Sequence, residues 1–112
     1  MTTVRDLTHL HCKPCADGAP ALTENESRAL LQQLDGWTLN DKSIRKTFAF
    51  KNYYQTIAFV NAIAWMTHRE DHHPDLTVGY NTCRVEYSTH AVGGLSENDF
   101  ICAAKVDALF KI

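Results

Sequence analysis

Apolar positions recur at helical spacing in one early stretch of the chain, "LTENESRALLQQLDGW". Thr23 and Glu26 have the three-residue spacing of an N-terminal capping box, in which each side chain bonds the backbone N–H of the other residue. The leucines that follow share one helical face, and Gly36 comes just after the last of them. This pattern predicts a first helix over residues 23–34.

The spacing changes to alternation in "WTLNDKSIRKTFAF", where two short runs flank a polar turn and predict a β-hairpin. Asn52 and Gln55 then repeat the capping spacing before "YYQTIAFVNAIAWMTHRE", a helical segment that extends toward Pro74. Apolar residues lie on more than one side of this second helix. A helix with so little polar surface predicts burial on two sides, and therefore an oligomer.

A second hairpin and a last helix complete the pattern. The run "DLTVGYNTCRVEYST" alternates around a polar turn, and "LSENDFICAAKVDALF" places Ser96 at a helix cap with Asp99 three residues later. Helices joined by hairpins favour an antiparallel sheet covered on one side. The predicted fold class is therefore α+β, a four-stranded antiparallel sheet with three helices packed on one face, in the order α-ββ-α-ββ-α.

Composition narrows the class of protein. Residues 1–21, with closely spaced prolines and a glycine, are expected to form an irregular N-terminal arm, and residues 22–112 a single domain. The chain has 11 basic and 13 acidic residues, a net charge of -2, and no run of Lys or Arg, which argues against direct nucleic-acid binding. No segment approaches the roughly 20 apolar residues of a membrane span. We therefore expect a soluble, cytoplasmic protein without a membrane partner.

Histidines supply the candidate chemistry. In "EDHHPDL", His72 and His73 directly precede a proline, His68 lies one helical turn earlier, and His90 follows the last predicted strand. A single metal ion rarely takes two adjacent side chains, because they diverge, and the motif HExxH is absent. One alternative is a plain helix C-terminus, where cationic side chains are mildly favoured. The other is a cleft in which several imidazoles transfer protons at neutral pH.

The run "HREDHHPDLTVGYNTCRVEYSTHAVGGLSENDF" closely resembles the pterin-4a-carbinolamine dehydratase family. The family pattern combines His-His-Pro, an aromatic residue, Ser-Thr-His after a strand, and the Asp of Leu-Ser-x-x-Asp. The resemblance extends from about Leu22 to Phe110 and includes the pair Gly36-Trp37. Relatives often carry Glu where His68 stands. The matching positions are His68, His72, His73, Pro74, Tyr80, His90 and Asp99.

This resemblance implies a hydro-lyase that dehydrates 4a-hydroxytetrahydrobiopterin to quinonoid dihydropterin, without a cofactor or metal. It also implies a link to aromatic amino acid hydroxylases such as phenylalanine hydroxylase, and a homodimer or homotetramer. The catalytic residues it implies are His72, His73 and His90. Among them we favour His72 and His90 for proton transfer and His73 for binding and orientation. Which imidazole is acid and which is base stays open. The implied substrate-binding residues are Trp37, Asp71, Pro74, Ser88, Thr89, Ala91 and Asp99.

Several of these residues have a structural alternative. Asp99 can serve only the capping box with Ser96, Trp37 can be an ordinary core aromatic, and Asp71 can be a solvated acid. At the level of the protein, the alternatives are a binding or regulatory role and a pterin-site relative in molybdopterin metabolism. The first arises because mammalian relatives also serve as a dimerisation cofactor for a homeodomain transcription factor.

The segment "HLHCKPC" is a competing motif. Cys12 and Cys15 have Cys-x-x-Cys spacing, and His9 and His11 could complete a zinc site with them. The usual long spacer between ligand pairs is missing, and no βαβ context follows for a thioredoxin-like function. We therefore expect free thiols on an irregular arm, with the remaining cysteines, Cys83 and Cys102, packed in regular elements.

Overall fold

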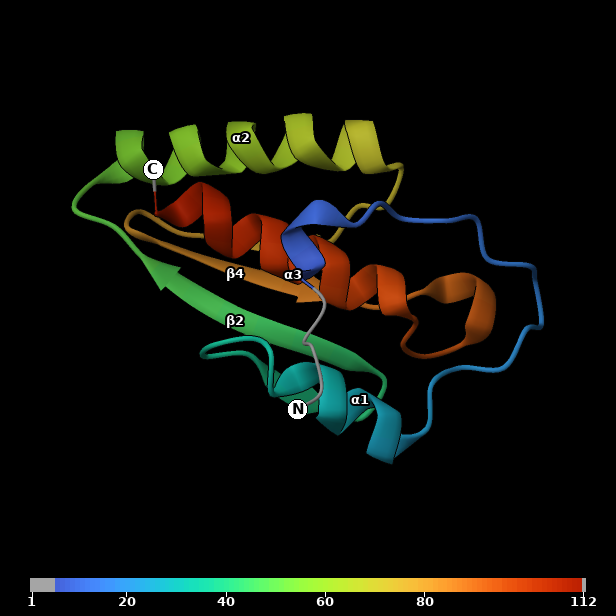
Figure 1. The fold of residues 1–112 in the computed structure, drawn as a ribbon. Helices are drawn as coiled ribbons and strands as arrows, with labels where there is room; N and C mark the ends of the chain where they lie inside the picture. Colours follow the sequence, from blue (N-terminus) through green and yellow to red (C-terminus); the bar gives the residue numbers. More distant parts are fainter. Residues whose placement is uncertain (1–5, 112) are drawn as a thin grey trace.

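Three helices lie on one face of a four-stranded antiparallel sheet (Figure 1). The structure is a computed structural model and describes residues 6–111. The strands occur in the sheet in the order β1-β2-β4-β3, and the α-ββ-α-ββ-α order of the elements confirms the predicted fold class. The elements are α1 (Glu24–Leu31), β1 (Thr38–Asn40), β2 (Ser43–Ala49), α2 (Tyr53–Glu70), β3 (Asp75–Val78), β4 (Thr82–Tyr87) and α3 (Glu97–Phe110).

The first helix begins as the sequence predicts and ends earlier. The Thr23 side chain accepts from the Glu26 backbone N–H, and the Glu26 carboxylate accepts from that of Thr23, so the predicted capping box is present. The helix was expected over 23–34, but α1 ends at Leu31. The chain continues in tighter turns of the 3-10 type, and Gly36 then takes a left-handed conformation, with φ 82°.

The end of α2 redirects the chain toward the site. Asp71 takes the left-handed conformation, with φ 54°, and the backbone N–H groups of Asp71 and His72 both bond the carbonyl of Thr67. Pro74 disfavours helix for the residue before it. His72 and His73 therefore lie beyond the helix, on the connection to β3, and not on its last turn.

The core lies between the sheet and α3. Strand β4 runs antiparallel to β2, pairing Ile44 with Tyr87 and Phe48 with Cys83, and these four side chains are buried. Helix α3 lies between α2 and α1 and covers the same face of the sheet (Figure 1). It contributes the fully buried Phe100, Cys102, Ala103 and Val106, so both Cys83 and Cys102 are packed thiols, as predicted. Helix α3 is consequently the central element of the fold.

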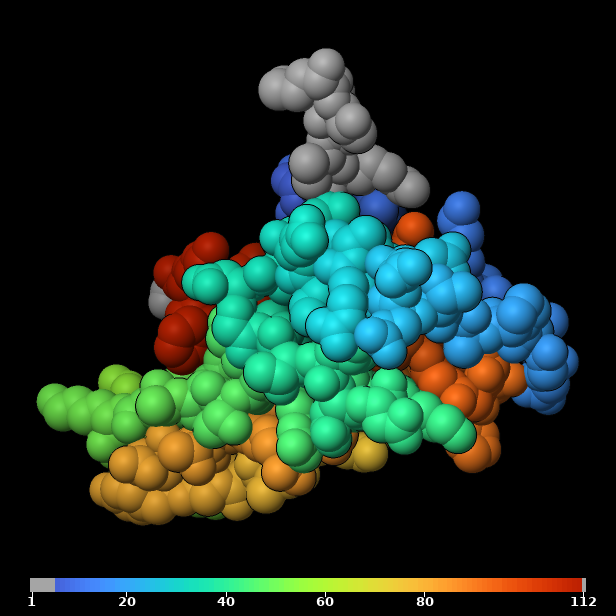
Figure 2. Space-filling model, turned by 90° about the horizontal axis from the view of Figure 1, so that it is seen from below, coloured from blue at the N-terminus to red at the C-terminus, as the bar shows by residue number. Residues whose placement is uncertain are grey.

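The described part of the arm packs on this body. It is irregular from residue 6 to 21 apart from a 3-10 turn, Leu7–His9, whose Leu7 is buried in the core; the rest of the predicted arm lies outside the described residues. The arm passes the loop after β4, where Gly18 donates to the carbonyl of Ala91, and joins α1, which faces the viewer in Figure 2. Among the described helices, none is long and apolar enough to cross a membrane.

Candidate active site

A cavity of about 700 Å³ opens where three segments meet. The segments are the connection from α2 to β3, the end of β4 with the 3-10 turn that follows it (His90–Val92), and the arm. Asn98 of α3 completes the wall. A cavity of this size is within the range of small-molecule sites. Among the residues predicted for the site, those that line the cavity are Asp71, His72, His73, Ser88, Thr89, His90 and Ala91.

His72 is anchored from below by a buried carboxylate. Its Nε2 lies 2.6 Å from Oδ1 of Asp99, which is fully buried, while the His72 side chain is 14% exposed. The imidazole also stacks on the ring of Tyr87, with centroids 5.4 Å apart. An ionised Asp99 favours the tautomer with its proton on Nε2, which leaves the Nδ1 lone pair free to accept a proton. The arrangement therefore gives His72 a fixed orientation and a counter-charge for its protonated form.

Asp99 serves two elements at once. Its Oδ2 accepts from the Thr89 hydroxyl at 2.8 Å and from the Ser96 backbone N–H at 2.9 Å, and the hydroxyls of Thr89 and Ser96 are 2.7 Å apart. The bond between Asp99 and the Ser96 N–H belongs to the predicted capping box of α3, which is present. The structural and functional interpretations of Asp99 are therefore compatible, because each uses a different carboxylate oxygen.

The other two histidines line the same cavity from different segments, and both are exposed. His73 follows His72, and its Nδ1 lies 3.3 Å from the carbonyl oxygen of Pro74. His90 begins the 3-10 turn after β4. The structure thus brings one anchored and two solvated imidazoles around a single cavity. That combination can bind a polar ligand and exchange protons with both ligand and solvent.

Two predicted residues do not line the cavity, in addition to the underlying Asp99. Pro74 directly follows the cavity-lining His73 in the sequence. Trp37 lies in the core and is 5% exposed. The indole N–H of Trp37 donates to Asp107 of α3 at 3.0 Å. Because Asp107 is about two helical turns from Asp99, Trp37 lies away from this cavity, and its substrate-binding role stays a prediction. Its buried N–H needs an acceptor and finds one away from the cavity.

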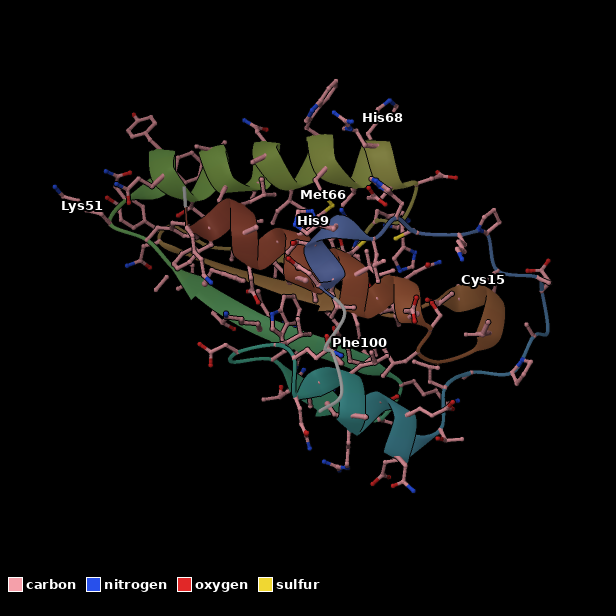
Figure 3. All side chains as sticks on the ribbon, in the orientation of Figure 1. His9, Cys15, Lys51, Met66, His68 and Phe100 are labelled. Carbon is pink, nitrogen blue, oxygen red and sulfur yellow. The ribbon has the colours of Figure 1, made fainter. Side chains whose placement is uncertain are left out.

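His68 also lies apart from the cavity. It is exposed on the outer side of α2 and points away from α3 (Figure 3). Its ring lies near that of Trp65, with centroids 6.1 Å apart. Although His68 and His72 are four residues apart, the left-handed Asp71 separates them by ending the helix, so helical spacing no longer applies.

Part of the arm forms a cavity wall that was not predicted. Lys13, Pro14 and Cys15 line the cavity, and Cys15 lies near the 3-10 turn after β4 (Figure 3). Asn98 holds this wall with both ends of its amide: it accepts from the Lys13 N–H at 3.0 Å and donates to the Lys13 carbonyl at 2.6 Å. Asn98 was missed, together with the cavity-lining acids Asp75 and Glu86.

Glu70, the last residue of α2, also fixes the arm. It accepts from the Cys12 backbone N–H at 2.8 Å and lies 2.9 Å from Nδ1 of His11. Burial alone would raise the pKa of Glu70, but the hydrogen bonds from Cys12 and His11 and the nearby charge of Lys105 more than offset it, and the pKa is lowered. The carboxylate is therefore ionised when it holds the arm.

The candidate zinc ligands of the arm do not converge on one point. His9 pairs with Asp6 and His11 with Glu70, while the Cys12 sulfur faces Cys102. Within residues 6–111, no group of three or more His, Cys, Asp or Glu side chains is arranged to hold a metal ion. The described arm thus forms one wall of the cavity, and hydrogen bonds hold it in place at several points.

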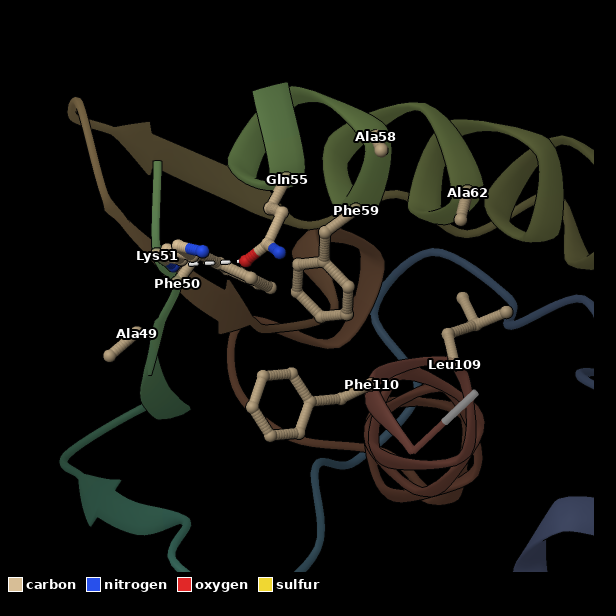
Figure 4. A pocket seen from close by; sticks show the side chains of 9 residues that line it. All are labelled: Ala49, Phe50, Lys51, Gln55, Ala58, Phe59, Ala62, Leu109 and Phe110. Atoms are coloured by element: carbon tan, nitrogen blue, oxygen red, sulfur yellow. Dashed lines mark hydrogen bonds between the residues drawn. The ribbon is translucent and has the colours of Figure 1, made fainter. Parts of the chain in front are cut away.

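A second cavity, of about 640 Å³, lies between α2 and α3 (Figure 4). Its walls are largely apolar, with Phe50, Phe59 and Phe110 in mutual ring contact. Lys51 is the sole ionisable group among the described residues that line it. It therefore lacks the paired acid and base that the first cavity offers.

Comparison with known proteins gives a consistent result. The family model described as pterin 4 alpha carbinolamine dehydratase matches residues 20–109. A protein of Nitrosospira multiformis, provisionally named pterin-4-alpha-carbinolamine dehydratase, is 66% identical over 111 residues, which cover 99% of this chain and 98% of that one. A protein of Nitrosomonas europaea with the same provisional name is 69% identical over 112 residues and 99% of each chain.

Two solved structures share the fold. A transcriptional coactivator/pterin dehydratase from Brucella melitensis has a TM-score of 0.77 at 33% identity, covering 80% of this chain and 97% of that one. A pterin dehydratase-like protein, identified as a RuBisCO assembly factor in the alpha-carboxysome, has a TM-score of 0.55 at 29% identity and covers 66% and 86%. The names of proteins with this fold thus describe both an enzymatic activity and a role in binding or assembly.

Proposed function

Because the chain belongs to the pterin-4-alpha-carbinolamine dehydratase family, we propose that it is a hydro-lyase acting on a 4a-hydroxytetrahydropterin such as 4a-hydroxytetrahydrobiopterin. The reaction expels the hydroxyl at carbon 4a as water and leaves quinonoid dihydropterin. The observation that carries this proposal is the pair His72 and Asp99 at the floor of a cavity that His73 and His90 also line. The provisional names of the close relatives support it.

The chemistry needs one proton removed from the ring nitrogen and one delivered to the leaving hydroxyl. We assign removal to His72, since the fully buried Asp99 stabilises the imidazolium that forms. Delivery is assigned to His90, which is exposed and can be reprotonated from solvent. The proton count balances, because water leaves with the proton that His90 supplies while His72 retains the one it takes.

Binding and orientation are assigned to the rest of the wall. His73 lines the cavity from the connection after α2, and Ser88, Thr89 and Ala91 line it from the end of β4 and the turn that follows. Glu86 accepts from the Ser43 hydroxyl at 2.6 Å and lines the same cavity. A carboxylate in this position suits the N–H donors of a pterin ring, and Asp71 adds a second one at the rim.

A stopped-flow ultraviolet assay tests the proposal. A hydroxylase generates the 4a-hydroxytetrahydropterin, and its decay is followed with and without the protein. We expect acceleration by the wild type, a loss of about 10²- to 10⁴-fold for His72→Ala and for His90→Ala, and no change for the matched variant His68→Ala on the outer face of α2. Near-normal rates for His72→Ala and His90→Ala in folded protein would overturn the catalytic assignment.

The same proposal includes a partner reaction and an assembly. An aromatic amino acid hydroxylase such as phenylalanine hydroxylase would supply the substrate, and a homodimer or homotetramer would bury the outer side of α2. Tyr54 and Trp65 on that helix are 81% and 65% exposed. The alternative is a binding or assembly role, which the names of the two structural relatives favour. A folded wild type that accelerates nothing in the assay would support it.

A further inference from the structure

Two cysteine sulfurs meet beside the candidate active site. Sγ of Cys12, on the arm, lies 3.3 Å from Sγ of Cys102, on α3, and the two residues are 90 positions apart in sequence. Both are free thiols. A disulfide bond is about 2.05 Å long, so the sulfurs must approach by little more than 1 Å to form one.

The contact belongs to a fixed part of the arm. The Cys12 backbone N–H donates to Glu70 at 2.8 Å, and its sulfur also lies 3.7 Å from the carbonyl oxygen of Asn98. The amide of Asn98 makes two further bonds to Lys13, the next residue. Cys12 is thus held toward α3 by bonds to its own backbone and to the next residue.

We propose that Cys12 and Cys102 form a redox pair, which a hydroperoxide oxidises to a disulfide that fastens the arm to α3 at the wall of the cavity. Within the described chain, the geometry favours this pairing over the Cys-x-x-Cys motif. The Cys15 sulfur instead contacts the Asn98 amide at 3.5 Å and the Lys13 carbonyl at 3.9 Å. Cys83 is buried in the sheet, on β4.

The oxidation balances in two steps. The half-buried Cys12 gives its thiol proton to solvent, and the thiolate sulfur attacks the terminal oxygen of the hydroperoxide. The S–O bond forms and the O–O bond breaks, which leaves a sulfenic acid on Cys12, while the departing alkoxide takes up a proton from solvent and leaves as the alcohol. The sulfur of Cys102 then attacks the sulfenic sulfur, so the S–S bond forms, the S–O bond breaks, and water leaves with the Cys102 proton. Two thiols and one hydroperoxide become one disulfide, one alcohol and one water.

The environment of each cysteine indicates which one reacts with the hydroperoxide first. The hydrogen bond to Cys12, together with burial, raises the pKa of Cys102, so Cys102 keeps its proton until the second step. Cys12 is half-buried, whereas Cys102 is buried. Cys12 is therefore the one that meets the oxidant, and Cys102 is the one that resolves the sulfenic acid.

The pair is connected to the candidate catalytic residues. The Cys102 sulfur lies 3.8 Å from the carbonyl oxygen of His72, whose ring stacks on Tyr87. On the other side, Cys12 directly precedes the arm wall of the cavity. Oxidation would remove the Cys102 thiol proton from this group of contacts and tie the arm wall covalently to α3.

Peptide mapping tests the pairing. Folded, fully reduced protein is treated with one equivalent of hydrogen peroxide, the remaining thiols are alkylated at acidic pH, and the digest is analysed by mass spectrometry. We expect peptides containing Cys12 and Cys102 to be linked in the wild type and in Cys15→Ser, and unlinked in Cys102→Ser. A Cys12–Cys15 disulfide, a disulfide between chains, or over-oxidised Cys12 without a link would overturn the proposal.

Thermal unfolding tests the fastening separately from catalysis. A link that closes a loop of 90 residues restricts the unfolded chain, so oxidation is expected to raise Tm by about 5 °C or more. The rise should occur in the wild type and in Cys15→Ser, reverse with dithiothreitol, and be absent in Cys12→Ser. A mapped disulfide that leaves Tm unchanged would contradict the fastening role. Neither readout depends on dehydratase activity.

Discussion

At the scale of single residues, Asp99 has the largest effect on the site, because it orients His72 and caps α3. It is fully buried, and its two oxygens have different partners, since Oδ1 contacts His72 while Oδ2 caps α3 and accepts from Thr89. An ionised carboxylate is costly to bury unless such bonds compensate for the lost hydration. The same bonds to Asp99 also give the His72 ring a single orientation.

We predict that Asp99→Asn lowers kcat by about 10²-fold or more, with little change in KM. The amide keeps one oxygen that can accept hydrogen bonds but carries no charge to stabilise an imidazolium at His72. Stopped-flow kinetics measure the loss, and urea unfolding measures the accompanying cost, expected at about 1–3 kcal/mol.

The matched control is Asp107→Asn on the same helix. Asp107 accepts from Trp37 and pairs with Lys46 at 2.9 Å, away from the cavity. This variant should lose a comparable amount of stability and keep its kcat. If the two variants lost kcat equally, the effect of Asp99 would be structural and its positioning role would be wrong.

At the scale of elements, the arm depends on Glu70. The Glu70 side chain is 7% exposed and binds Cys12 and His11 in its ionised form, which lowers its pKa. A carboxyl group whose pKa is lower in the folded state stabilises the fold above its unfolded pKa, near 4.5, and this contribution disappears as the pH falls through the folded pKa.

We therefore predict that Glu70→Gln costs about 1–3 kcal/mol at pH 7 and that the difference from the wild type shrinks below about pH 4.5. Urea unfolding of both proteins at a series of pH values measures it. Glu24→Gln is a suitable control, because Glu24 forms an exposed pair with Arg28 within α1 and should cost little at any pH. A Glu70→Gln deficit that persists unchanged at pH 3 would contradict this explanation.

Local sequence signals predicted the helices and hairpins, but not the contacts between segments that are far apart in sequence. The capping boxes of α1 and α3 and both hairpins follow from residues that are neighbours in sequence, and the structure confirms them. The arm wall depends on Glu70 and Asn98, which bind arm residues 58 and 85 positions away. The spacing of apolar and polar residues along the chain carries no information on contacts between residues so far apart in sequence. Trp37 shows the same limit, because its acceptor, Asp107, lies 70 positions away.

At the scale of the whole molecule, the outer side of α2 is left without cover in a single chain. Helix α2 packs against α3 and the sheet through Phe59, Ile63 and Met66, which are buried. Tyr54 and Trp65 lie on its exposed surface, three helical turns apart. Large aromatic side chains at this exposure are typical of surfaces that contact another protein.

We predict that the protein is a homodimer or homotetramer and that Trp65→Glu shifts it toward the 12.6 kDa monomer. A charge at this position would have to be desolvated in the interface without a partner, which costs far more than the exposed charge costs the monomer. Size-exclusion chromatography with light scattering gives the mass of each variant. Tyr80→Glu, which alters an equally exposed aromatic on the β3–β4 turn, should leave the mass unchanged. A mass that falls with Tyr80→Glu and not with Trp65→Glu would place the interface on that turn, and the interpretation of α2 would be wrong.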